Sequence, residues 1–144
     1  MTVNAIAEVL GGKKVLKRKI SSSDDLVRLT REGLPVDILR ELAEELHIDR
    51  QVVASLVGIP ARTLSRRLSS RSRLSAAESD RSVRFARVVA QAKDIFDDLA
   101  AAANWLQAPN RVLKGQRPID LLDTDAGVQQ VETVLGRIAY GVYS

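Results

Sequence analysis

The sequence predicts an all-α fold, with a helix-turn-helix module in the first half and a second helical module after it. Apolar residues recur three or four positions apart through most of the 144 residues, which is the spacing of one face of a helix. Glycines, prolines and good capping residues divide this pattern into about seven or eight segments of helical length. No stretch alternates apolar and polar residues as a half-buried strand would. We therefore expect helices throughout.

Composition limits the chemistry open to this chain. Hydrophobic residues make up 45% and charged residues 28%, as in soluble globular domains, and no apolar run approaches the roughly 20 residues of a membrane span. The first residues lack the pattern of a signal peptide, so we expect a cytoplasmic protein. Cysteine is absent and His47 is the one histidine, which excludes disulfides, thiol nucleophiles and Cys- or His-rich zinc sites. We expect no catalytic residue, no metal site and no cofactor, and so no enzyme.

Residues 1–22 are predicted to form a basic N-terminal arm that could include a short helix. Ile6, Val9 and Leu10 have helical spacing, and the two glycines after Leu10 would end that helix. Residues 11–20, GGKKVLKRKI, contain five basic side chains. They lack the glycine spacing and the hydroxyl after lysine of a nucleotide-binding loop. A mobile arm or a secondary phosphate contact is the better interpretation.

Two helices are expected between the arm and the turn. Ser22 or Ser23 can cap the first, which should extend to about Arg31. Its buried residues should be Leu26, Val27 and Leu29. The second helix should begin at Pro35 and brace the helix-turn-helix. Its apolar face consists of Val36, Leu39, Leu42, Ala43 and Leu46.

The segment from Asp49 to Arg67 has the pattern of two short helices around a tight turn. Asp49 is a good N-cap, and Gly58-Ile59-Pro60 supplies a residue tolerant of positive φ, an apolar plug and a proline. On the second helix, Ala61, Leu64 and Leu68 should face inward. The outward residues would be Arg62, Thr63, Ser65, Arg66 and Arg67.

Charge indicates a DNA partner for this turn. Between Arg50 and Ala77 there are six arginines and no acidic residue, whereas a solvated structural face mixes both signs. Residues 1–73 carry 14 Lys and Arg against 9 Asp and Glu, and residues 74–144 carry 8 against 9. In a helix-turn-helix the second helix enters the major groove, and dimers bind palindromic or repeated sites. The alternative is an ordinary helical hairpin. The candidate DNA-binding residues are Arg50, Gln51, Arg62, Thr63, Ser65, Arg66, Arg67, Arg71 and Arg73.

The second half should begin with a long helix. Ser75 and Glu78 match a capping box. The apolar stripe that follows consists of Phe85, Val88, Val89, Ala92, Ile95, Phe96 and Leu99. A further helix should extend from Ala100 to Leu106 and bury Trp105, and Pro118 should open a short one. Asp123 or Thr124 would cap the last helix, in which Gly136 suggests close packing. Its stripe is Val128, Val131, Leu135 and Ile138.

Residues 35–144 resemble the Xre–MbcA–ParS antitoxin family of bacterial toxin–antitoxin modules, in particular an Xre-type antitoxin. The specific features are Arg62-Thr63-Leu64 with Arg66-Arg67, Leu74-Ser75 with Glu78 and Arg81, Trp105-Leu106 with Pro109-Asn110, Gly115 with Pro118, and Gly136-Arg137-Ile138 with Gly141-Val142-Tyr143. The resemblance implies a DNA-binding module at residues 23–73 and a helical toxin-binding and dimerisation module at residues 74–144. Residues 1–34 carry no feature of the family.

The resemblance also implies partners. They are the protein's own operator DNA, a second copy in a homodimer, and a RES-domain toxin that degrades NAD, bound in a higher hetero-oligomer. The end of the antitoxin would block the toxin's active site, with Arg137, Tyr140, Gly141, Val142, Tyr143 and Ser144 as the candidate residues. Alternatively, Tyr140 and Val142 close the protein's own core. A helix-turn-helix repressor whose second half only dimerises is the other functional interpretation.

Overall fold

A computed structural model describes residues 2–141, and this part of the chain is helical, which confirms the all-α prediction. The elements are α1 (Val3–Val9), α2 (Gly12–Leu16), α3 (Ser23–Glu32), α4 (Asp37–Leu46), α5 (Arg50–Val57), α6 (Ala61–Ser70), α7 (Ala76–Phe96), α8 (Leu99–Gln107), the 3-10 turn η1 (Pro118–Leu121) and α9 (Asp125–Ala139). Among residues 2–141, none of the helices combines the length and the apolar composition of a membrane span.

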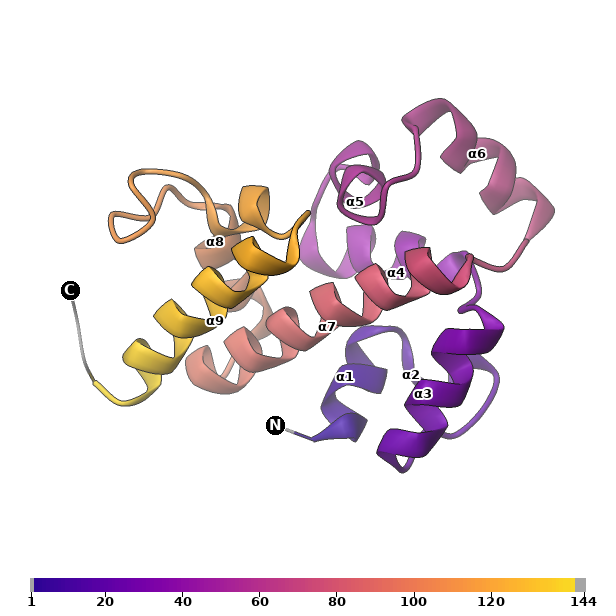
Figure 1. The fold of residues 1–144 in the computed structure, drawn as a ribbon, viewed down its shortest axis with the longest axis horizontal. Coiled ribbons are helices and arrows are strands. Elements are labelled where there is room, and N and C mark those ends of the chain that lie inside the picture. Colours follow the sequence, from indigo (N-terminus) through magenta and orange to yellow (C-terminus); the bar gives the residue numbers. More distant parts are fainter. Residues whose placement is uncertain (1, 142–144) are drawn as a thin grey trace.

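Helix α7 is the element around which the others pack. Its 21 residues span about 32 Å, and Figure 1 shows it running through the middle of the molecule, with α6 near one end and α9 along the other. The predicted capping box is present, because Ser75 Oγ accepts from the Glu78 amide and Glu78 accepts from the Ser75 amide. The side chains that α7 buries in the core include Phe85, Val88, Val89 and Ala92.

The N-terminal segment is part of this core and does not form a mobile arm. Helix α1 packs against α7, and Leu10, Leu16 and Ile20 are buried. The short helix expected near Ile6 is therefore confirmed, and α2 follows it directly. Gly11 has φ +104°, and an added Cβ would lie 2.6 Å from Cβ of Val15, so the chain turns tightly there. The basic residues of this segment project from a fixed scaffold.

Two expectations for α3 and α4 are wrong. Val27 was expected to be buried together with Leu29 but is 44% exposed, because residues two apart on a helix point to nearly opposite sides and Leu29 faces the core. Helix α4 begins at Asp37 and not at Pro35. Pro35 instead forms an isolated antiparallel bridge with Arg73, beside a hydrogen bond from the Leu74 amide to the Leu34 carbonyl (2.8 Å). This contact ties the start of α4 to the segment that leaves α6.

The prediction that Gly136 marks close packing is also wrong. A Cβ at Gly136 would meet nothing within 4 Å. Gly127, in the first turn of α9, is the closely packed glycine, because a Cβ there would collide with the carbonyl of Leu121 in η1. Thr124 is the cap of α9, accepting from the Gly127 amide at 3.0 Å. Trp105 is half-buried and lies against Phe96, with ring centroids 5.8 Å apart.

Candidate functional site

Helices α5 and α6 form the predicted helix-turn-helix. Asp49 Oδ1 accepts from the Gln51 amide (2.7 Å), which caps α5. Gly58 follows with φ +82°, a conformation that side-chain-bearing residues rarely adopt, and Ile59 inserts into the core. Leu64 and Leu68 fix the inner side of α6. Ala61 was expected to face inward with them, but it is exposed because it occupies the first turn, beyond the core.

The outer side of α6 carries exposed cations without acidic neighbours. Arg62, Ser65 and Arg66 are exposed and Thr63 is half-buried. Neither Arg62 nor Arg66 pairs with a carboxylate of the described residues. Such a side chain is free to contact phosphates or base edges in a groove.

The remaining DNA-binding candidates surround this face. Gln51 is exposed at the start of α5. Arg50 is exposed too and lies 3.9 Å from Glu44, a loose ion pair. Arg71 is exposed and ends α6 in a left-handed conformation, with φ +52°.

Arg67 occupies a different environment from Arg66, its neighbour in sequence. Its guanidinium donates from Nη1 and Nη2 to the two carboxylate oxygens of Glu78, each at 2.9 Å, and from Nη2 to the Arg73 carbonyl at 3.1 Å. The side chains of Arg67 and Glu78 are 21% and 19% exposed. These hydrogen bonds lower the pKa of the Glu78 carboxyl below its ordinary value, against the opposing effect of burial. The pair thus joins α6 to the first turn of α7.

Arg81 contacts the turn between α5 and α6, and Arg73 holds the segment that follows α6. Arg81 of α7 donates to the Val57 carbonyl at 3.2 Å, where α5 ends with unpaired carbonyls. Its guanidinium lies so close to Gly58 that an added Cβ there would be 2.7 Å from Nη1. Arg73 donates to the Gly33 carbonyl at 2.6 Å, although it was predicted to face DNA. The orientation of α6 therefore depends on polar contacts from α7 and from the loop before α4.

Sequence reasoning missed the second role of Glu78. The capping box with Ser75 already accounted for an acidic residue at position 78. Its partner Arg67 lies 11 positions earlier, and no local sequence pattern indicates a pair at that spacing. One signal was available: Glu78 is the first acidic residue after the arginine-rich, acid-free stretch that begins at Arg50. A carboxylate at the end of such a stretch is a natural partner for one of its arginines.

The end of α9 holds the second set of predicted residues. Arg137, Tyr140 and Gly141 are exposed, and Tyr140 is 88% exposed. Tyr140 therefore does not close the core. Val142, Tyr143 and Ser144 lie outside the described residues. The rest of α9 is fixed on α7 by its apolar stripe and by Glu132, which accepts from Arg87 at 3.0 and 3.2 Å. The C-terminal end of α9 lies far from α6 (Figure 1).

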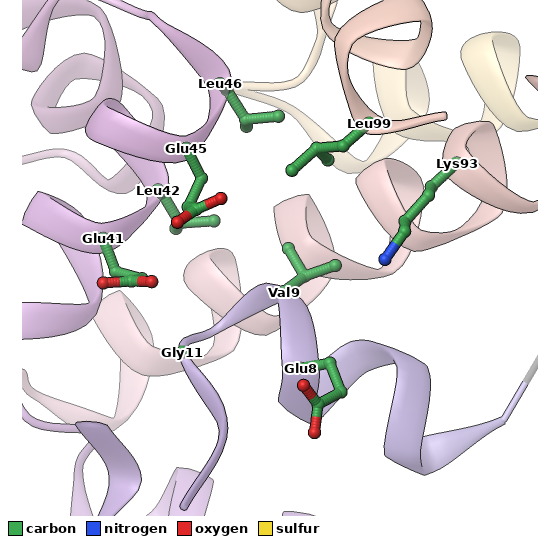
Figure 2. Close-up of a pocket in the computed structure, with 9 residues that line it drawn as sticks. All are labelled: Glu8, Val9, Gly11, Glu41, Leu42, Glu45, Leu46, Lys93 and Leu99. Carbon is green, nitrogen blue, oxygen red and sulfur yellow. The ribbon is translucent and has the colours of Figure 1, made fainter. Parts of the chain in front are cut away.

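A pocket of about 270 Å³ lies where α1, α4, α7 and α8 meet. Figure 2 shows Lys93 extending toward it from α7, with Glu45 and Leu42 of α4 on the other side. Glu8 and Glu41 supply further carboxylates, and none of these charged groups forms an ion pair within residues 2–141. None of its lining residues belongs to α6, so this pocket is separate from the cationic face of α6.

Two family models match the chain, one for each half. Residues 25–87 match the antitoxin Xre-like helix-turn-helix domain, which includes α5, α6 and most of α7. Residues 91–141 match the antitoxin Xre/MbcA/ParS C-terminal toxin-binding domain, which includes α8 and α9. The exposed faces of α6 and of the α9 end therefore fall in different matched domains.

Whole-chain relatives agree with these matches. An antitoxin Xre of Photorhabdus laumondii is 36% identical over 125 residues, covering 86% of this chain and 84% of the relative. A protein of a Sphingobium species named Prs ADP-ribosylating antitoxin is 27% identical over 133 residues, with coverages of 86% and 84%. The fold resembles that of a chain in the crystal structure of the Mycobacterium tuberculosis MbcT–MbcA toxin–antitoxin complex. The TM-score is 0.55 and the identity 24%, and the match covers 76% of this chain and 96% of the matched chain. The resemblance inferred from sequence is confirmed: the chain belongs to the Xre/MbcA/ParS antitoxin family.

Proposed function

We propose that this antitoxin neutralises an NAD-degrading RES-type toxin through the end of α9 and represses its own operon through α6. It acts in the cytoplasm as a homodimer, forms a larger hetero-oligomer with the toxin, and is not an enzyme. The observation that carries the proposal is the separation of two exposed surfaces, a cationic one on α6 and one around Arg137 and Tyr140. Each falls in the matched domain expected for its partner.

On the DNA side, the residues that face the groove are Arg62, Thr63, Ser65 and Arg66. Arg50, Gln51 and Arg71 contact the backbone. Arg67 and Arg73 already donate to Glu78 and to the Gly33 carbonyl, so their contribution is to hold α6 in position. One module offers few contacts, and a dimer on two half-sites supplies the rest.

On the toxin side, Tyr140 and Arg137 have the composition of interface hot spots. The exposed end of α9 is followed in the sequence by Val142, Tyr143 and Ser144, the other residues proposed to block the toxin's active site. A relative carries the name Prs ADP-ribosylating antitoxin, and ADP-ribosylation draws its ADP-ribose from NAD. That name supports a toxin that uses NAD.

Co-expression with the neighbouring gene tests this function. The toxin alone should stop growth and deplete cellular NAD, and the full-length antitoxin should restore both. Deleting Val142–Ser144 should restore toxicity while the two proteins still co-purify. Unchanged protection by the truncated chain would contradict active-site blocking. A neighbouring gene that neither stops growth nor co-purifies would favour the alternative, a repressor whose second half only dimerises.

A further inference from the structure

We propose that Lys13, Lys17, Arg18 and Lys19 form a second DNA-contacting surface, here called the α2 basic surface. It binds backbone phosphates that flank the half-site read by α6, without regard to base sequence. This inference rests on the proposed DNA binding and assigns a role to residues 2–24, which lie outside both matched domains.

The α2 basic surface includes a hollow with more basic than acidic side chains in its lining, and Lys17 lies outside that lining. Asn4, Lys13, Arg18 and Lys19 line a hollow of about 280 Å³, which has room for a phosphate group. Lys13, Lys17 and Lys19 are exposed and pair with no carboxylate of the described residues. Arg18 pairs with Glu32 at 2.8 Å, and Glu8 is the one acid in the lining. The balance in the hollow therefore favours an anion.

This surface is fixed in place. The flanking Leu16 and Ile20 are buried, and Gly12 is buried at the start of α2. Lys17 ends α2 with φ +63°, which turns the chain at the first of three successive basic residues. A rigid array of cations loses less entropy on binding a polyanion than a mobile arm would.

Short-range contacts connect the α2 basic surface to the C-terminal end of α6. Arg73, just after α6, donates to the Gly33 carbonyl, and the preceding Glu32 pairs with Arg18. Gly33 itself touches the Leu74 carbonyl, where an added Cβ would collide. In Figure 1 the end of α3 accordingly lies next to the connection from α6 to α7. Arg18 is thus linked through Glu32 and Gly33 to Arg73, the residue that follows the end of α6.

Position favours DNA over an acidic protein or an anionic membrane. The surface adjoins the end of the helix proposed to read DNA, whereas the toxin-binding domain begins at residue 91. When α6 lies in the groove of a half-site, the phosphates that flank this half-site would be the polyanion nearest to the α2 basic surface. Contacts with them add affinity and salt dependence without adding base preference.

The test compares two variants that remove the same amount of charge. One is Lys13→Gln/Lys17→Gln/Lys19→Gln. The control is Lys93→Gln/Arg111→Gln/Lys114→Gln, which removes three exposed cations from the other half, so each variant lowers the formal net charge from +4 to +1. Dissociation constants for the promoter duplex and a random duplex are measured from about 50 to 200 mM salt, and the slope of log K against log salt changes by about 0.9 for each phosphate that the protein no longer neutralises.

The first variant should lower the slope by about 2 to 3 on both duplexes and leave the ratio of the two affinities unchanged. The control should change the slope by less than about 1. An unchanged slope in the first variant, or equal slope changes in both variants, would overturn the inference about the α2 basic surface. The proposed DNA binding by α6 would stand. A first variant that keeps the slope but no longer inhibits the toxin would assign the surface to the toxin and also overturn it. A wild-type chain that binds neither duplex would overturn the proposed DNA function as well.

Discussion

The two helices that carry the candidate partner surfaces, α6 and α9, are held against the rest of the chain by different forces. Helix α9 is held mainly by apolar packing, with Val128, Val131 and Leu135 fully buried. Helix α6 buries Leu64 and Leu68, and its remaining attachment is the Arg67–Glu78 pair with the contacts that Arg73 and Arg81 make nearby. Apolar burial involves no titrating group, whereas an ion pair is lost when its carboxylate is protonated and is screened by salt. Helix α9 also has the Arg87–Glu132 pair, but its side chains are 38% and 27% exposed, more than the 21% and 19% of Arg67 and Glu78. The attachment of α6 should therefore respond more strongly to pH and salt than the attachment of α9.

The largest effect is expected in the apolar attachment. Leu135→Ala should lower the free energy of unfolding by about 2 to 5 kcal/mol, because it removes a fully buried side chain and leaves a cavity. Thr133→Ala, an exposed change on the same helix, is the matched control and should stay within about 0.5 kcal/mol. Denaturant unfolding measures both. A decrease of less than about 1 kcal/mol for Leu135→Ala would be too small for a cavity in the core. It would contradict the claim that apolar packing is the main attachment of α9.

The polar attachment should give a smaller stability effect with a functional consequence. Glu78→Gln should lower the free energy of unfolding by about 1 to 3 kcal/mol, because Arg67 loses a charged acceptor while half-enclosed. Operator affinity should fall even though Glu78 touches no DNA. Asp120→Asn breaks a similar bidentate pair, in which Asp120 is 48% and Arg117 40% exposed, so it should cost less than about 1 kcal/mol. Equal operator affinity in both variants would show that the Arg67–Glu78 pair does not position α6.

The pH dependence of stability should separate the two attachments further. The pKa of the Glu78 carboxyl is lowered in the folded state. Between the folded and the unfolded pKa, the folded state therefore binds fewer protons than the unfolded state. The stabilisation is complete above the unfolded pKa of about 4.3 and is lost as the pH falls through the lower folded value. The free energy of unfolding of the wild type should thus fall more steeply below about pH 5 than that of Glu78→Gln. Parallel curves would contradict a stabilising role for this carboxylate.

The smallest effect is expected at Gly136. Alanine there should raise stability by about 0.5 to 1 kcal/mol, since an added Cβ meets nothing within 4 Å and helix propensity improves. Gly127→Ala should do the opposite, because its Cβ would collide with Leu121. Thermal unfolding measures the pair. If Gly136→Ala stabilises the chain but weakens toxin binding, the toxin lies close against this side of α9. If Gly136→Ala destabilises the chain, the result would contradict the free space around Gly136.

Local patterns predicted most of the fold. Capping at Asp49, Ser75 and Thr124, and the turn at Gly58, depend on residues within a few positions of one another, and the structure confirms each. The core stripes of α4, α7 and α9 follow from helical spacing in the same way.

Contacts between distant segments could not be predicted from these patterns. Exposure of Val27, engagement of Arg67 by Glu78 and the contact of Gly127 with Leu121 all depend on how helices are placed in space. The same limit applies to the candidate site. Sequence identified the arginines of α6, but it did not distinguish Arg66, which pairs with no carboxylate in residues 2–141, from Arg67, which is engaged.

The most direct test of two separate partner surfaces is made on a single variant, Arg66→Ala. Arg66 is exposed and unpaired within the described residues, so its removal should leave the fold intact. One preparation is assayed for promoter binding and for inhibition of the co-expressed toxin. Promoter affinity should fall about 5- to 150-fold, since an arginine that contacts a base or phosphate accounts for about 1 to 3 kcal/mol, while toxin inhibition should be unchanged. Loss of both activities in the folded variant, or of neither, would contradict two separate partner surfaces.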